Sequence, residues 1–292
     1  MNLARLTKLL NDGHKLPYGF FKEELTDDVY HAGPGIGSTM VKTFLDSPAR
    51  YNWIYNQGHR EAPNDAMVFG SALHCAVLQP DLFPKKYVSF IKAEGTGSRA
   101  RNEAAKAEIE KSGQVALPLD QINTINHMVE GIRRYIGPYL DGGISESSYY
   151  WTDEETGLLC KVRLDHVFGA TIFDLKSTSD ISKIQSHIAN FNYHVQAAFY
   201  SDAFDILKGE RPNFIFLFCE KSEPYLLDAV MLDQEALQLG RDRYRESLKG
   251  IQLCQELGQW PASLASITAN KEIAQIRTIG LPRWAFYKGV DG

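Results

Sequence analysis

A short apolar stretch that ends in an acid and a lysine constrains the fold of this chain more than any other feature. The stretch reads Ile-Phe-Asp-Leu-Lys over residues 172–176. Asp174 and Lys176 are two apart, so on a strand their side chains lie on the same face. Residues 168–170 (Phe-Gly-Ala) predict a turn, and Asp165 stands before it. The pattern therefore predicts a hairpin that brings Asp165 beside Asp174 and Lys176.

Two carboxylates and an ammonium group at one point on a sheet suit metal-dependent phosphodiester hydrolysis. Carboxylate oxygens bind hard divalent cations, and a lysine can act on the attacked phosphate or on the attacking water. The alternative is a solvated strand face with an ordinary ion pair between Asp174 and Lys176. An acid and a lysine at the end of an apolar strand favour the first interpretation, because buried charges need partners.

The second half of the chain predicts strands that are interrupted by one helical region. Aromatic and β-branched residues indicate five strands, and apolar periodicity indicates a helical region after the third strand and a long helix after the fifth. The strands span 145–152, 158–168, 171–176, 213–220 and 225–232, and the helices span 181–207 and 233–256. Charged and apolar residues alternate along 158–168, which predicts one charged face that includes Asp165. The order indicates a mixed α/β fold.

One domain accounts for most of the 292 residues. We expect a partly ordered leader over 1–32, with one short helix near 3–10, and a single domain over 33–292. Within this domain we expect a helical part at 33–140 (helices near 66–78, 101–112 and 118–136), the sheet with its helices at 141–260, and a tail at 261–292. Residues 92–101 are basic and rich in glycine, and they predict a mobile loop.

Composition excludes several classes of protein. A net charge of −5 argues against a protein that coats DNA without sequence preference, but a nuclease with a local basic stripe stays open. The four cysteines form no C-x-x-C pair, which excludes zinc ribbons, and their apolar neighbours predict buried thiols. We find no apolar run long enough to cross a membrane and no signal-peptide pattern, so we expect a cytoplasmic protein.

Four further residues are candidates for a site. His74 lies on the largely apolar helix predicted over 66–78, where a core histidine and a metal ligand are both open. Gln196 and Tyr200 are four apart and share a helix face, so they either orient a phosphate or lie on an ordinary surface. Glu146 is either a neighbour of the acids across the sheet or an ordinary acid at a strand start.

Taken in order, these candidates resemble the PD-(D/E)XK nuclease superfamily. The matching pieces are a histidine on a helix, an Asp, an Asp-x-Lys and a Gln-x-x-x-Tyr helix, here carried by His74, Asp165, 174–176 and 196–200. Residues 38–48 also look like the start of this family. Within the superfamily, the chain is similar to the RecB-like branch and to the phage-type exonuclease VIII (RecE) nuclease domains.

The resemblance implies a restriction-endonuclease-like fold, with a central mixed β-sheet flanked by helices and an N-terminal helical elaboration. It implies that Mg²⁺ or Mn²⁺ is bound by His74, Asp165, Asp174 and the Leu175 backbone carbonyl. Lys176 would position or activate the attacking water, and Gln196 and Tyr200 would align the DNA strand and the lysine. We further expect DNA contacts from Arg163, Ser177, Thr178, Lys92, Arg99 and Arg101, although the last three also fit a solvated loop.

The implied activity is that of a DNA exonuclease. It would digest double-stranded ends from 5′ to 3′, leave 3′ single-stranded tails for recombination, work with a single-strand annealing protein and form a homo-oligomer. The alternatives are a DNA-binding or interaction module on a decayed nuclease fold, a structure-specific endonuclease, and a metal-dependent hydrolase of small phosphoesters.

Overall fold

A six-stranded mixed sheet forms the centre of the computed structural model, which describes residues 1–12, 17–264 and 280–281. The strand order is β1-β4-β5-β6-β7-β8, and every neighbouring pair is antiparallel except β6 and β7, which are parallel. The strands are β1 (Tyr18–Phe20), β4 (Ile144–Thr152), β5 (Leu159–Phe168), β6 (Thr171–Thr178), β7 (Asn213–Glu220) and β8 (Leu227–Val230).

All five strands predicted for the second half are present, with small shifts at their ends. The largest shift is in β8, which begins at Leu227 and not at Tyr225, because Tyr225 has a left-handed φ of 58° and belongs to the preceding turn. Helices make the crossover from β6 to the parallel strand β7, as parallel neighbours require. The crossover contains η2 (Ile181–Lys183), α9 (Ile184–Asn190) and α10 (Tyr193–Lys208).

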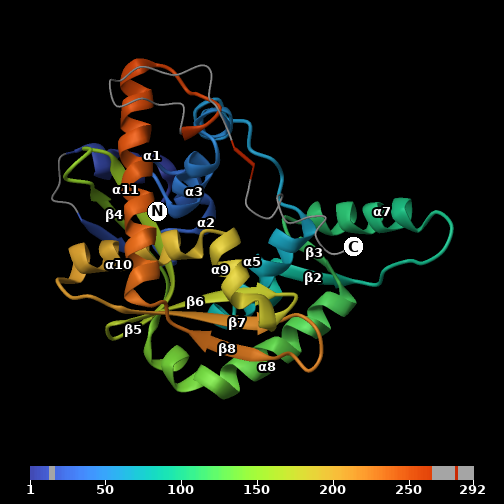
Figure 1. The fold of residues 1–292 in the computed structure, drawn as a ribbon. Helices are drawn as coiled ribbons and strands as arrows, with labels where there is room; N and C mark the ends of the chain where they lie inside the picture. Colours follow the sequence, from blue (N-terminus) through green and yellow to red (C-terminus); the bar gives the residue numbers. More distant parts are fainter. Residues whose placement is uncertain (13–16, 265–279, 282–292) are drawn as a thin grey trace, which may run out of the picture.

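Helices cover both faces of the sheet (Figure 1). α3 (Ser38–Asp46), α10 and α11 (Gln234–Leu257) pack on one face, and α5 (Asp65–Leu78) and α8 (Leu119–Gly142) pack on the other. The short segments α4 (Pro48–Tyr51), η1 (Asn52–Asn56) and α6 (Phe83–Lys86) connect these elements.

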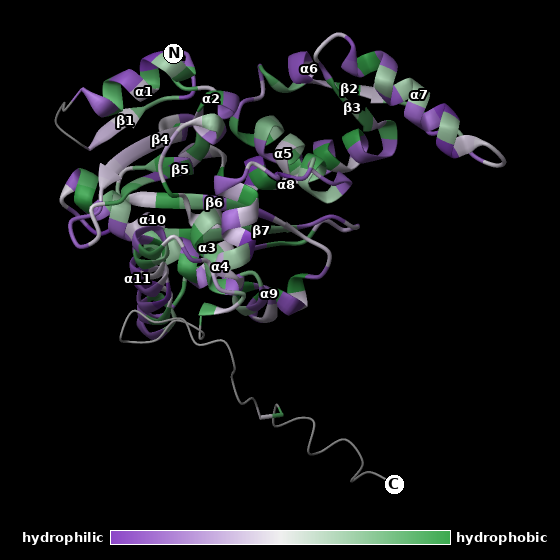
Figure 2. Ribbon diagram, turned by 90° about the horizontal axis from the view of Figure 1, so that it is seen from above, coloured by the Kyte–Doolittle hydropathy of each residue, from purple (hydrophilic) through white to green (hydrophobic). Residues whose placement is uncertain are grey.

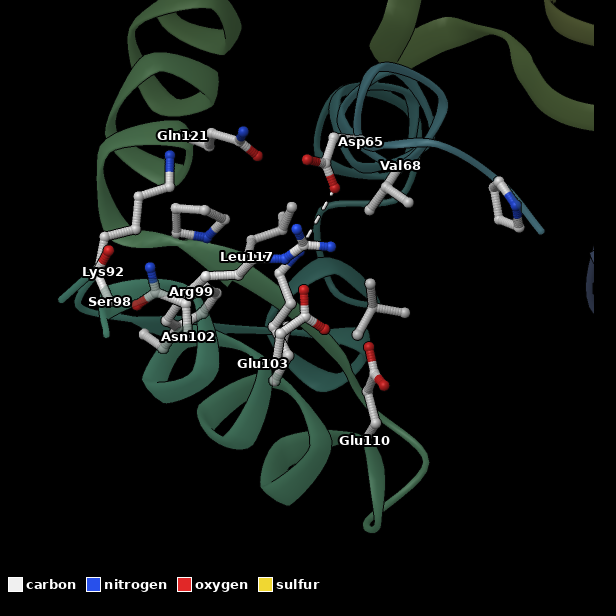
Figure 3. A pocket seen from close by; sticks show the side chains of 16 residues that line it. Asp65, Val68, Lys92, Ser98, Arg99, Asn102, Glu103, Glu110, Leu117 and Gln121 are labelled. Atoms are coloured by element: carbon white, nitrogen blue, oxygen red, sulfur yellow. Dashed lines mark hydrogen bonds and ion pairs between the residues drawn. The ribbon is translucent and has the colours of Figure 1, made fainter. Parts of the chain in front are cut away.

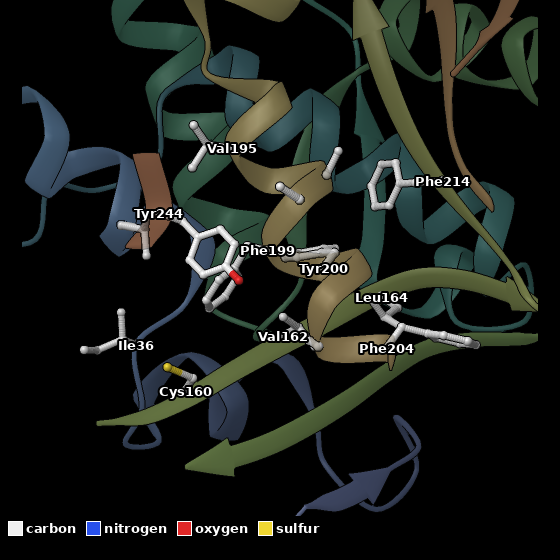
Figure 4. Packing of buried hydrophobic residues seen from close by; sticks show 14 of the residues in the cluster. Ile36, Cys160, Val162, Leu164, Val195, Phe199, Tyr200, Phe204, Phe214 and Tyr244 are labelled. Carbon is white, nitrogen blue, oxygen red and sulfur yellow. The ribbon is translucent and has the colours of Figure 1, made fainter. Parts of the chain in front are cut away.

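Two buried apolar clusters hold the layers together. Neighbouring residues of β6 point to opposite faces, so Ile172 joins the core beneath α10 and Phe173 joins the core beneath α5 and α8. Figure 4 shows the first of these cores, where Leu164 of β5 lies against Phe204 of α10. Because both faces are covered, β6 and β7 are apolar over most of their length.

A smaller unit, which we call the arm, projects from the body of the molecule (Figure 2). It consists of the parallel strands β2 (Tyr87–Phe90) and β3 (Val115–Pro118) and the helix α7 (Ser98–Glu110) between them. The loop predicted over 92–101 is therefore too long. α7 begins at Ser98, directly after Gly97, whose left-handed φ of 75° is readily adopted by glycine.

The first 32 residues contain more structure than the one short helix that the sequence predicted. That helix is α1 (Leu3–Asn11), and β1 and α2 (Asp27–Ala32) follow it. β1 pairs with β4 and forms one edge of the sheet. Leu6 and Leu25 pack against Tyr150 of β4 in a third buried cluster, so this segment is tied to the sheet.

The architecture confirms the predicted fold class, a restriction-endonuclease-like mixed sheet between helices. The four cysteines are buried and free, as their apolar neighbours predicted. Among the described residues, no helix combines the length and the apolar character needed to cross a membrane. Most of the predicted tail at 261–292 lies outside the described residues.

Candidate metal and nuclease site

The candidate site lies where β5 and β6 separate, at a point that we call the fork. The antiparallel ladder ends at the pair His166–Phe173, and its register places Asp165 opposite Asp174. Beyond that pair, the Leu175 backbone N–H donates a hydrogen bond to Oδ2 of Asp165 at 2.8 Å. The Asp165 carboxylate thus takes the place of a backbone acceptor on β5. Asp165 and Asp174 lie side by side, as the predicted hairpin implied.

The alternation along β5 breaks at the same place. Leu164 and Val167 enter the same core although they are three residues apart, so the predicted single charged face does not continue through Asp165. On β4, Glu146 is opposite Asp165 in register and has a left-handed φ of 56°. The irregular backbone leaves Asp165 bonded to β6, while the Glu146 carboxylate bonds to Arg163 at 2.9 Å.

Asp174 is the buried centre of the site, with 1% of its side chain exposed. Its Oδ1 atom accepts a hydrogen bond from Nε2 of Gln196 at 2.6 Å. Its Oδ2 atom forms an ion pair with the Lys176 ammonium group. Both oxygens of Asp174 therefore have a partner within the protein, and the Asp165 carboxylate faces them.

His74, which α5 positions, contacts two of the other expected ligands. Its Nε2 atom donates to the Leu175 carbonyl at 2.8 Å, and its Nδ1 atom is 3.4 Å from Oδ2 of Asp165. With the proton assigned to Nε2 by its carbonyl partner, Nδ1 and the carboxylate oxygen both present lone pairs to the gap between them. A cation ligand and a hydrogen-bonded core histidine would both show this arrangement, so the ligand role of His74 stays a prediction.

Burial and neighbouring charges shift the pKa values of two residues at the fork. Burial raises the pKa of Asp165 to about 6, against the opposing effect of His74 and with support from the Asp174 carboxylate. Burial lowers the pKa of Lys176, but the carboxylates of Asp174 and Asp165 outweigh it and raise that pKa above its ordinary value. Lys176 therefore stays protonated at neutral pH.

α10 supplies the polar residues that face Asp174. Gln196 reaches Asp174 directly, whereas the Tyr200 hydroxyl accepts a long hydrogen bond of 3.5 Å from Ser38 of α3. Burial raises the pKa of Tyr200. The sequence analysis missed Tyr193, whose ring centroid lies 5.1 Å from Nζ of Lys176. Its position three residues before Gln196, on the same helix face, was the available signal.

Two of the expected DNA contacts are buried. Arg163 is 8% exposed, and its guanidinium group donates to Glu146, to Ser148 at 2.8 Å and to the Leu25 carbonyl at 3.1 Å. These partners lie inside the protein, so Arg163 holds the N-terminal segment and is not available to DNA. Thr178 is also buried, whereas Ser177 is partly exposed.

The three remaining expected contacts lie on the arm. Lys92 and Arg99 line a cavity of about 460 Å³ between α7, β3 and the start of α5 (Figure 3), and acids such as Glu103 line it as well. Arg101 is exposed and donates to two carbonyls of the preceding loop. None of the expected metal ligands lines this cavity, so the arm and the fork are separate regions.

The groups at the fork fit a hard divalent cation. Two carboxylates, an imidazole and a backbone carbonyl gather there, and the buried carboxylates of Asp165 and Asp174 repel each other. In the described part of the chain, no three His, Cys, Asp or Glu side chains form a metal-binding group by themselves. The carbonyl and oxygens from water or substrate would therefore have to complete the ligand set.

Comparisons with known proteins identify the family and the fold. A family model described as "PDDEXK-like domain of unknown function (DUF3799)" matches residues 37–272. A crystal structure of a "Putative exonuclease" from Eubacterium rectale shares the fold, with a TM-score of 0.59 and 14% identity over 93% of this chain and 99% of that chain. No curated protein matches the sequence. Members of the PD-(D/E)XK superfamily generally use divalent metal ions. The chain belongs to this PDDEXK-like family, and with it to the PD-(D/E)XK nuclease superfamily.

Proposed function

We propose that this protein is a metal-dependent exodeoxyribonuclease that degrades double-stranded DNA from its ends. The proposal is carried by the fork, where the buried carboxylates of Asp165 and Asp174 face each other beside Lys176 and His74. Two buried carboxylates repel each other, and a bound cation would relieve that repulsion. The intact set of Asp165, Asp174 and Lys176 argues against a decayed nuclease fold.

The residues at the fork divide the chemistry between them. His74, Asp165, Asp174 and the Leu175 carbonyl would hold Mg²⁺ or Mn²⁺, which would neutralise charge on the attacked phosphate and lower the pKa of water. Lys176 is protonated, so it donates to the attacking water or to a phosphate oxygen and does not take up a proton itself. Its fixed positive charge stabilises the negative charge that develops on the phosphate.

Gln196 and Tyr200 act through their neighbours. Gln196 donates to Oδ1 of Asp174 and so fixes the orientation of this carboxylate toward Lys176 and Asp165. Tyr200 is buried and its hydroxyl contacts Ser38, so it holds α3 against α10 and does not stack on a base. The expectation that Tyr200 aligns the DNA strand is thus replaced by a positioning role.

The choice of DNA ends as substrate rests on the resemblance to phage-type exonuclease VIII domains, and the name given to the Eubacterium rectale protein supports it. The same resemblance favours digestion from 5′ to 3′, which would leave 3′ tails for a single-strand annealing protein in recombination. It also favours a homo-oligomer.

A gel assay with Mg²⁺ tests the proposal directly. The substrates are a linear duplex labelled at its 5′ ends, the same duplex labelled at its 3′ ends, and a closed circular duplex. We expect early release of the 5′ label, persistence of the 3′ label on long strands, and an intact circle.

Other outcomes of this assay select other functions. Rapid cutting of the circle would favour the structure-specific endonuclease. Hydrolysis of p-nitrophenyl phosphate without cleavage of DNA would favour a small-phosphoester hydrolase. Full Mg²⁺-dependent activity in Asp174→Ala would show that the cleavage does not come from the fork.

A further inference from the structure

Helix α3 runs alongside α10 in the opposite direction and places two side chains against it. Ser38 donates to Tyr200, and Nζ of Lys42 lies 5.5 Å from the ring centroid of Tyr193. Ser38 and Lys42 are four residues apart, so they lie on one face of α3. Two residues one turn apart on α3 thus contact Tyr200 and Tyr193 of α10. Tyr193 also contacts Lys176.

Lys42 has a cationic neighbour and no anionic partner. Within the described residues, its half-buried ammonium group makes no hydrogen bond and no ion pair, and its contact is the Tyr193 ring. Lys176 lies over the same ring, at 5.1 Å. Burial and then the Lys176 charge lower the pKa of Lys42 to about 8, and Asp174 and Asp46 oppose the shift. Two ammonium groups over one ring repel each other, and Lys42, unlike Lys176, has no carboxylate in an ion pair to offset that repulsion.

The charges at the fork indicate which anion would offset this repulsion. Three carboxylates, those of Asp165, Asp174 and Asp46, act on the two ammonium groups of Lys176 and Lys42 as long as no metal ion is bound. A divalent cation would leave the site with an excess of positive charge. A phosphodiester backbone supplies the missing negative charge, and an ammonium group binds phosphate without regard to base sequence.

We propose that Lys42 binds a backbone phosphate of the DNA strand beside the metal site, and that it shares Tyr193 with Lys176 as a common support. This inference rests on the proposed function and adds to it a substrate-binding residue on helix α3. Lys42 is the second lysine of the site, in addition to the Lys176 of the Asp-x-Lys motif.

Lys208 provides a matched control. It also lies over a tyrosine ring, at 5.9 Å from the centroid of Tyr149, but it is the last residue of α10. Along the helix it is about 22 Å from Tyr193. A loss of binding that arises from any missing lysine–tyrosine contact would appear in Lys208→Ala as well.

The experiment measures fluorescence anisotropy of a labelled linear duplex with Ca²⁺ in place of Mg²⁺, at several salt concentrations, with a gel to confirm that the duplex stays intact. We expect about tenfold weaker binding for Lys42→Ala and a salt-dependence slope that is smaller by about one. The loss should be the same for unrelated duplex sequences. Lys42→Arg should restore most of the affinity, and Lys208→Ala should bind as wild type.

Further measurements separate binding from folding and from metal loading. Lys42→Met keeps the apolar stem over Tyr193, so it should retain the wild-type melting temperature and still bind DNA weakly. Mn²⁺ affinity, measured by calorimetry, should not fall in Lys42→Ala, because the variant removes a cation near the metal ligands.

The inference is overturned if wild type and Lys42→Ala bind the duplex with equal affinity and equal salt slope, or if Lys208→Ala loses as much. Failure of the proposed function looks different: the wild-type protein itself would then neither bind nor cleave linear DNA.

Discussion

Two groups of buried charges lie next to each other on β5, and they differ in how completely they are satisfied. Around Arg163, Glu146, Ser148 and the Leu25 carbonyl accept hydrogen bonds from the guanidinium group. At the fork, two residues further along β5, the buried carboxylates of Asp165 and Asp174 face each other, and one ammonium group, that of Lys176, pairs with Asp174.

The difference shows how a structural ion pair is distinguished from a site. Burial and charge are common to both groups, and both would look alike in a list of buried polar residues. The Arg163 guanidinium group makes its hydrogen bonds to groups inside the protein, so it is not free to bind a ligand. At the fork the two carboxylates still repel each other, and carboxylate oxygens are the ligands that a divalent cation prefers.

The largest expected effect is on activity, in Lys176→Ala. Loss of the ammonium group should lower cleavage of linear duplex by roughly 10³- to 10⁴-fold, because the charge on the attacked phosphate loses a fixed donor. Mn²⁺ binding by calorimetry should persist, since the expected ligands remain. Lost Mn²⁺ binding would contradict the assignment of Lys176 to the phosphate and the water, and Lys208→Ala serves as the control.

The next effect is on stability, in Arg163→Met. This change leaves the Glu146 carboxylate buried without its partner and should lower the free energy of unfolding by about 3–5 kcal/mol. Urea denaturation measures it. The double variant Arg163→Met with Glu146→Gln should recover part of the loss. If Arg163→Met is as stable as wild type, the Arg163 group does not stabilise the fold, and the contrast with the fork is lost.

Much of this contrast could not be predicted from the sequence. Lys161 and Arg163 alternate with apolar residues on β5, a pattern typical of a strand with one solvent-exposed face. The structure covers that face with residues 128 or more positions earlier, since Lys161 donates to the carbonyls of Tyr30 and Gly33. Backbone carbonyls have no sequence signature, so nothing local indicates that these charges are buried.

The fork was predictable because its geometry is local. Asp174 and Lys176 share a face through strand alternation, and a three-residue turn returns the chain to Asp165. His74 and Gln196 needed the resemblance to a known family, because they arrive from other elements. Lys42 was missed, since its contact with Tyr193 spans about 150 residues and a lysine on a short helix is ordinarily solvated.

A smaller effect concerns pH and Asp165→Asn. The folded pKa of Asp165 is raised from 3.8 to about 6, so the folded protein binds the proton more tightly and loses stability as pH rises through that range. With EDTA at pH 7.5, Asp165→Asn should therefore be more stable than wild type by about 2 kcal/mol, and this advantage should disappear below about pH 4.

Excess Mn²⁺ should reverse that order, because only the wild-type protein keeps both carboxylates for the ion. Thermal melts with EDTA and with Mn²⁺ make the comparison. If the variant is less stable than wild type in EDTA at neutral pH, the fork is satisfied internally and resembles the Arg163 group.

The smallest effect is expected on the arm, in Lys92→Ala. Lys92 and Asp120 form an exposed ion pair at 3.5 Å, with 49% and 69% of their side chains in solvent. Removing the pair should change stability by no more than about 0.5 kcal/mol. Duplex binding should weaken only two- to threefold if the arm contacts the backbone as expected. A loss as large as that of Lys42→Ala would place the main DNA contact on the arm.

The hydrogen bonds of Lys161 and Arg163 on β5 also limit where the protein can be shortened. Sequence similarity to the family begins at residue 37, but the carbonyls that accept from Lys161 and Arg163 belong to Leu25, Tyr30 and Gly33. A fragment that starts at the family boundary would lose these acceptors together with β1, and β4 would become an open edge. The start of the family match is therefore not a safe place to truncate the protein. A folded fragment must also keep residues before 37, which the family model does not match.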